Sequence, residues 1–167
     1  GNQRFIQYTL CLDEKGYGVF RGDSALQQGI YLIITPEKKY FEILVGEDQH
    51  FSFSANTDDF IHSIDFQGSE VNEAFNEYQK FMIRQNKRSQ ELRKRLKANK
   101  GNSDSTEVIN NKLSELDKKV KDHWNSIVSE YPNTVLASII QAMQTPEVPE
   151  FDIPEDVSNP DSVKWVK

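Results

Sequence analysis

The hydrophobic pattern of the chain changes once, close to Gly68. Before this residue, apolar and polar residues alternate with a period of about two, which is typical of β-strands. After it, apolar residues recur at intervals of three and four, which is typical of amphipathic helices. The sequence therefore predicts an α+β fold: a small antiparallel β-sheet or half-sandwich, followed by a long antiparallel helical hairpin and a short third helix.

Residues 29–55 read as three short strands joined by two tight turns, and we expect the other segments to cover or extend them. Residues 30–34 are apolar on both faces, which is typical of a strand in the middle of a sheet or beneath a second layer. The alternation also predicts which side chains of the next two strands point inward. These side chains are Phe41, Ile43, Val45, Phe51 and Phe53.

The segment that precedes these strands reads as a hairpin. Residues 5–12 alternate as a strand does, residues 13–16 have turn chemistry, and residues 18–21 should return beside the first strand. Cys11, the single cysteine, falls in that first strand. Because a lone cysteine among strand residues is usually an unreactive buried thiol, we expect Cys11 to be buried.

The helical half begins at Ser69, which can cap a helix, and it should contain two long helices and a short one. We expect a loop over residues 97–104, a second helix that begins near Ser105 or Thr106 and ends before Pro132, and a third helix over about 134–143. Two long helices with a short connector form an antiparallel hairpin. Its tip, near Lys100, should project into water.

These patterns divide the chain into three parts. Residues 1–67 are predicted to form the antiparallel sheet, and residues 68–144 the helical hairpin with the third helix. Residues 145–167 are rich in proline and acidic side chains, which is typical of a linker toward a further module. Residues 159–161 resemble the start of another helix.

Composition and motifs give little support for chemistry. The net charge of −6 argues against a general nucleic-acid binder. His50, His62 and His123 share no spacing of metal ligands, so we expect surface or interface histidines and no metal site. The chain has no nucleophile elbow and no glycine-rich phosphate loop. We therefore predict no cofactor, no catalytic residue and no enzymatic activity for this segment.

One basic run stands out in the first long helix. It is opposed there only by Glu91, and its members are Arg84, Lys87, Arg88, Arg93, Lys94, Arg95, Lys97 and Lys100. One interpretation is a solvated arm that acidic residues of the second helix partly neutralise, namely Glu107, Glu115 and Asp117. The other is an interaction surface for anionic lipid or an acidic protein, formed by Arg93, Lys94, Arg95 and Lys97. Nucleic acid is disfavoured because no aromatic residues lie between the charges.

The aromatic stripe of the helices also leaves two interpretations open. Phe75 and Tyr78 of the first helix and Trp124 of the second can form a packed core, or they can line a groove for a ligand or peptide between the sheet and the helices.

Four stretches of the sequence resemble a known family. They are G-I-Y-L-I, P-E-K-K-Y-F-E-I-L, D-Q-H-F-S and F-Q-G-S-E-V-N-E-A-F. Over roughly residues 8–145 the chain resembles the N-terminal β-rich domain of unknown function that precedes a thioredoxin-like (TlpA/AhpC-TSA-type) domain in Gram-negative cell-envelope proteins, which are often lipoproteins. The resemblance implies a periplasmic parent attached to the outer membrane or cell envelope, which contacts the membrane only through an anchor outside this sequence. The redox CxxC of such proteins lies in the downstream domain, so no catalytic residue carries over to this chain.

Three functional hypotheses follow. The first is a non-catalytic accessory module of a thioredoxin-like thiol–disulfide protein, whose partners are the downstream domain, a second copy or another envelope protein. The second is a binding module that uses the sheet–helix groove. The third is an arm-type interaction protein that uses the basic hairpin.

Overall fold

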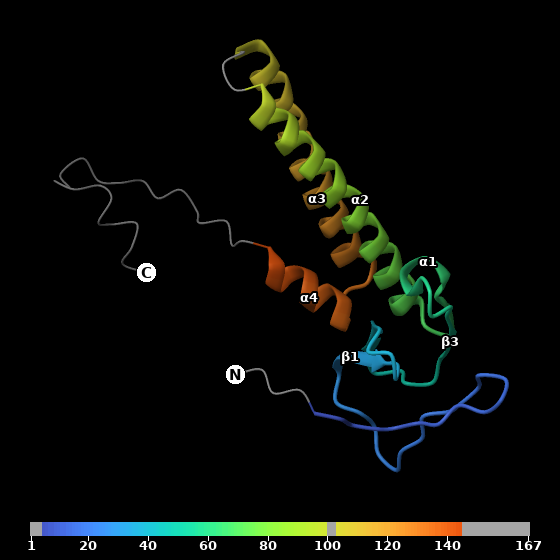
Figure 1. The fold of residues 1–167 in the computed structure, drawn as a ribbon. Coiled ribbons are helices and arrows are strands. Elements are labelled where there is room, and N and C mark those ends of the chain that lie inside the picture. The colour runs from blue at the N-terminus through green and yellow to red at the C-terminus, as the bar shows by residue number, and fades with distance from the viewer. Residues whose placement is uncertain (1–4, 100–102, 145–167) are drawn as a thin grey trace, which may run out of the picture.

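The computed structural model describes residues 5–99 and 103–144 and has the predicted α+β architecture (Figure 1). Two small antiparallel sheets of two strands each are followed by two long helices and a short one. The elements in chain order are β1 (Gly29–Ile34), β2 (Tyr40–Val45), β3 (Ser52–Ser54), α1 (Phe60–Ser63), β4 (Asp65–Gln67), α2 (Glu70–Ala98), α3 (Ser103–Glu130) and α4 (Val135–Met143).

The central stretch forms two sheets because β3 pairs with β4 and not with β2. β1 and β2 form a hairpin whose turn is closed by a hydrogen bond from the Thr35 N–H to the Lys39 carbonyl, at 2.9 Å. In the second sheet, Phe53 lies opposite Phe66. A period of two identifies the buried face of a strand but not its neighbour, so the pattern could not reveal this pairing.

The prediction that β1 lies mid-sheet or beneath a second layer is wrong. β1 pairs only with β2, and Ile30 and Ile34 are 49% and 63% exposed. β2 takes the central place instead, because packed clusters lie against both of its faces. Phe41, Ile43 and Val45 are buried on one face as predicted, whereas Leu44 is buried on the other.

The first cluster is aromatic and joins β2 to the second sheet. The Phe41 ring meets the Phe53 ring edge to face, with centroids 5.4 Å apart, and it also contacts Phe60 of α1 at 4.8 Å. Phe66 of β4 is buried in the same cluster. Edge-to-face and tilted aromatic pairs are favourable beyond the area they bury, so this cluster holds two short sheets together.

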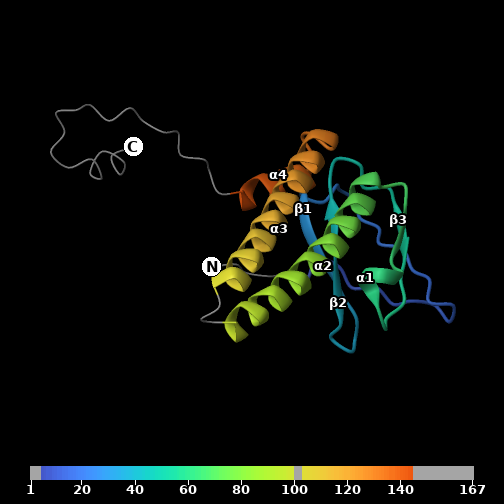
Figure 2. The same cartoon turned by 90° about the horizontal axis from the view of Figure 1, so that it is seen from above.

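The second cluster is helical and includes Leu44 of β2. α2 and α3 run side by side, α4 packs against α3, and the inner ends of α2 and α4 contact β2 (Figures 1 and 2). The buried members of this cluster are Leu44, Phe75, Tyr78, Ile127, Leu136 and Ile140. The short helix α4 buries Leu136, Ala137 and Ile140, whereas its last three residues are exposed.

Asn72 forms the joint between β2 and the helices. It is only 1% exposed, and its Oδ1 accepts a hydrogen bond from the Leu44 N–H at 2.7 Å. Its Nδ2 donates to the Leu44 carbonyl at 2.8 Å and to the Ser69 Oγ at 2.9 Å. Ser69 is the N-cap of α2, as predicted. The turn before it requires Gly68, whose φ of +81° is disfavoured for residues with a side chain.

The predicted N-terminal hairpin has its turn but not its strands. The Asp13 N–H donates to the Tyr17 carbonyl at 2.9 Å, and Gly16 has a φ of +77°. The structure describes residues 5–28 without strand pairing, and Cys11 is exposed, so the prediction of its burial is wrong. Two isolated strands without a covering layer are marginally stable in water, which explains why alternation alone does not order this segment as a sheet.

The helix boundaries largely agree with the sequence prediction, although α3 begins at Ser103 rather than near Ser105 or Thr106. A short helix, α1, lies between β3 and β4, where the hydrophobic pattern predicted no helix. The predicted tip near Lys100 and the predicted linker over residues 145–167 lie outside the described residues. No helix in the described part of the chain is long and apolar enough to cross a bilayer.

The hydrogen bonds between Asn72 and Leu44 predict that Asn72→Ala destabilises the fold. The change leaves the buried N–H and C=O of Leu44 without partners, so the free energy of unfolding should fall by about 2–4 kcal/mol. Asn86→Ala, on the exposed side of the same helix, should change it by about 0.5 kcal/mol or less. Urea denaturation of both variants measures this difference. Equal midpoints would show that Asn72 does not join the two halves.

Candidate functional site

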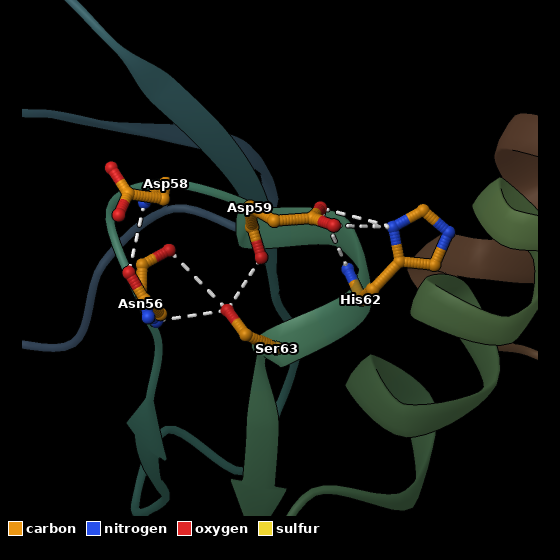
Figure 3. Close-up of polar contacts among 5 residues, drawn as sticks. All are labelled: Asn56, Asp58, Asp59, His62 and Ser63. Atoms are coloured by element: carbon orange, nitrogen blue, oxygen red, sulfur yellow. Dashed lines mark hydrogen bonds and ion pairs between the residues drawn. The ribbon is translucent and has the colours of Figure 1, made fainter.

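The close-up in Figure 3 shows the one Asp–His contact within hydrogen-bond distance in the described chain, at α1. Asp59 Oδ2 lies 2.9 Å from His62 Nδ1. The Ser63 hydroxyl does not extend this pair into a triad, because it donates to the Asp59 carbonyl and accepts from the Asn56 N–H at 2.8 Å. A nucleophilic serine needs the base nitrogen as its partner.

The Asp59–His62 pair is a helix cap. Asp59 is the N-cap of α1, and its carboxylate accepts from the His62 N–H at 3.3 Å. Hydrogen bonds from the His62 side chain and backbone hold the pKa of Asp59 below its ordinary value. Both side chains are more than half exposed, so the contact is a surface interaction. Its structural role is to order the residues before β4.

His123 lies in the helical hairpin between two aromatic rings. Its centroid is 4.0 Å from that of Phe81 and 6.4 Å from that of Tyr78, both on α2. Burial lowers the pKa of His123, and the nearby charge of Arg84 lowers it further. His123 was expected at a surface or interface, but it is a half-buried packing residue. Its position one residue before Trp124, on the apolar stripe of α3, was the sequence feature that could have indicated this burial.

The three candidate groove residues belong to the helical cluster. Phe75 and Tyr78 are 4% and 9% exposed, and Trp124 packs against the same cluster. Burial raises the pKa of the Tyr78 hydroxyl, which lies 3.9 Å from the Met143 Sδ. We therefore assign these side chains to core packing, the other interpretation that the sequence left open.

The four candidate basic residues lie on the outer half of α2 and are all exposed; they are Arg93, Lys94, Arg95 and Lys97. No ion pair within the described residues involves these cations. A hollow of about 310 Å³ lies between the outer ends of α2 and α3, and its charged lining residues are Arg95, Asp104 and Lys112. This mixed lining does not select one sign of ligand.

Metal ligands do not gather in the described part of the chain, where no group of three or more His, Cys, Asp or Glu side chains could hold an ion.

The edge of β1 was not anticipated from the sequence. Because Asn72 binds the N–H and C=O of Leu44 on the side away from β1, the Ile30–Leu44 pair is not hydrogen-bonded across the hairpin. Hydrogen-bonded and non-hydrogen-bonded pairs alternate in an antiparallel hairpin. The N–H and C=O groups of Ile30, Leu32 and Ile34 therefore point away from β2, toward an edge where the described chain places no strand.

Exposed apolar side chains lie beside this edge. Ile34 and Tyr40 are cross-strand neighbours and are 63% and 61% exposed. β1 itself, G-I-Y-L-I-I, contains no charged residue and no proline, the features that usually protect an edge strand from pairing. This absence of protection was the signal available in the sequence.

His123 generates a prediction about pH. Its pKa lies below the ordinary 6.5, so the unfolded chain binds more protons than the folded chain as the pH falls through 6.5. The contribution of neutral His123 to stability is complete above that pH and declines below it, toward the lower folded pKa. His123→Phe should therefore flatten the dependence of unfolding free energy on pH between about 7 and 5, whereas the control Asn86→Ala, which removes no titratable group, should not. Urea titrations at three pH values measure both slopes; an unchanged slope in His123→Phe would contradict the assignment.

No protein-family model, no curated protein and no solved structure matches this chain. The resemblance to the β-rich envelope domain therefore stays a prediction that rests on the sequence motifs alone.

Proposed function

We propose that this chain is a non-catalytic interaction module and that its docking site is the free edge of β1. The observation that carries the proposal is the set of outward-pointing backbone groups at Ile30, Leu32 and Ile34, on a strand with one neighbour. Such an edge recognises an extended segment of a partner by adding it as a further strand.

The surroundings of β1 suit a partner strand with apolar side chains. On one face of the hairpin, the incoming strand would lie beside Ile30 and Ile34, which are now partly in water. On the other face it would extend the aromatic cluster, against which Tyr31 and Ile33 already pack. Backbone hydrogen bonds would supply affinity, and these two apolar faces would supply selectivity.

The polar side chains that could most readily take part in catalysis already form structural hydrogen bonds, which supports a binding role. Asp59, His62 and Ser63 order the turn at α1, and Asn72 holds α2 against β2.

We propose further that the protein served by this module is a thioredoxin-like thiol–disulfide protein of the cell envelope, with this segment in the periplasm. The support for this context is the sequence resemblance, which implies an accessory role in placement, docking or dimerisation. A peptide ligand at the same β1 edge is the second candidate, and the same unpaired backbone groups favour it.

Leu32→Pro tests the docking site, with Leu32→Ala as its matched control. The Leu32 N–H points away from β2, so proline removes a donor from the free edge while the β1–β2 ladder keeps its hydrogen bonds. Alanine removes the side chain but keeps this N–H. Phage-displayed random peptides of about 12 residues, long enough to pair with a strand of 6 residues, serve as the probe.

Peptides selected on the natural chain should show alternating apolar positions. They should bind Leu32→Pro at least about tenfold more weakly than Leu32→Ala, which corresponds to about 1.4 kcal/mol. Thermal unfolding of both variants verifies that the hairpin still folds. Selected peptides that bind Leu32→Pro as tightly as Leu32→Ala would overturn the proposal.

A further inference from the structure

We infer that the outer half of the helical hairpin, residues 84–99 and 103–122, is a cationic arm that binds an anionic phospholipid surface. This inference is independent of the β1 edge, because it rests on charge and on a different part of the fold. Of the described residues, 84–99 and 103–122 include 11 basic and 6 acidic residues, whereas 5–83 and 123–144 include 5 basic and 14 acidic residues. Positive charge is thus concentrated in the arm of a chain whose net charge is −6.

The cations of α2 in this arm are exposed and without acidic partners. All seven side chains are exposed to solvent: Arg84, Lys87, Arg88, Arg93, Lys94, Arg95 and Lys97. The ion pairs of the described residues involve Lys39, His62 and Lys80, all outside the arm. Arg93 donates to the Ser89 hydroxyl at 3.3 Å, which leaves its charge uncompensated.

Helical geometry gathers a subset of these cations on one face. Leu92 is buried against α3, in a cluster with Ile109 and Leu116, and this contact defines the inner face of the arm. Helical spacing places three lysines on the side opposite Leu92, over about 15 Å of helix axis. They are Lys87, Lys94 and Lys97.

The shape of the molecule makes this face accessible to a flat surface. α2 and α3 extend together far beyond the sheets, so the outer half of the arm stands away from the acidic residues 5–83 (Figures 1 and 2). An anionic bilayer could approach the arm while this negatively charged part of the described chain stays at a distance. Screening by salt over about 10 Å weakens the opposing repulsion further.

The side chains of the arm favour phospholipid over nucleic acid or an acidic protein. No aromatic residue occurs within residues 84–122, so bases would find no stacking partner. Exposed aliphatic side chains accompany the charges instead, with Ile83 and Val108 48% and 52% exposed. Long Lys and Arg stems beside exposed aliphatic groups suit the boundary between headgroups and acyl chains.

Vesicle co-sedimentation tests the inference with two triple variants of equal charge change. The arm variant is Lys87→Gln, Lys94→Gln and Lys97→Gln, and the control variant is Lys15→Gln, Arg21→Gln and Lys38→Gln, all at exposed positions. Glutamine keeps the helix propensity of lysine and arginine. The vesicles are phosphatidylcholine alone or an equal mixture of phosphatidylcholine and phosphatidylglycerol.

The natural chain and the control variant should bind the mixed vesicles but not pure phosphatidylcholine, and high salt should release both. The arm variant should bind at least about tenfold more weakly, with an unchanged circular dichroism spectrum. Failure of the natural chain to bind the mixed vesicles would overturn the inference, as would equal losses in the two variants. Tighter binding to single-stranded RNA or to polyglutamate than to the mixed vesicles would also overturn it.

Discussion

The carboxamide of Asn72 occupies the place that the backbone of a neighbouring strand would take beside Leu44. A buried carboxamide without partners would be costly, but Asn72 uses its oxygen once and its nitrogen twice. The first turn of α2 is thereby fixed to β2. Leu44 then projects into the helical cluster, while the side chains on either side of it project into the aromatic cluster. One amide thus sets how the two halves of the fold meet.

This joint has consequences for the surfaces that stay free. Because α2 is fixed at the Leu44 side of β2, the sheet keeps its unpaired edge on β1, together with the exposed Ile34 and Tyr40. The same attachment directs the long hairpin away from the sheets (Figure 1). The fold therefore presents two separated surfaces, one apolar with free backbone groups and one cationic. An interaction module that contacts a protein segment with one surface and an anionic bilayer with the other is consistent with this division.

The sequence predicted features that local chemistry determines. The structure has the predicted change from strands to helices near Gly68 and the Ser69 cap. It also has the predicted end of α3 before Pro132 and the predicted buried face of β2. Features that depend on tertiary pairing could not be predicted from one sequence. Alternation in residues 5–12 predicted a strand around Cys11, but it could not show that no partner strand covers it.

The candidate sites show the same limit. Exposure of the basic residues on α2 follows from their charge, whereas the free edge of β1 follows from the absence of strand pairing in residues 5–28. Asn72 was visible only as a polar residue three positions after a helix cap, and helix periodicity gives no reason to expect it to bind a strand backbone. The burial of His123 likewise depends on the angle at which α2 and α3 pack.

Backbone amide hydrogen exchange, followed by nuclear magnetic resonance, tests the central claim most directly because it reads both sides of the hairpin at once. The account predicts that the Leu44 amide, bound to Asn72, exchanges as slowly as the paired amides of Tyr31 and Ile33, whereas the Leu32 amide exchanges rapidly. Strong protection of Leu32, or rapid exchange at Leu44, would contradict it.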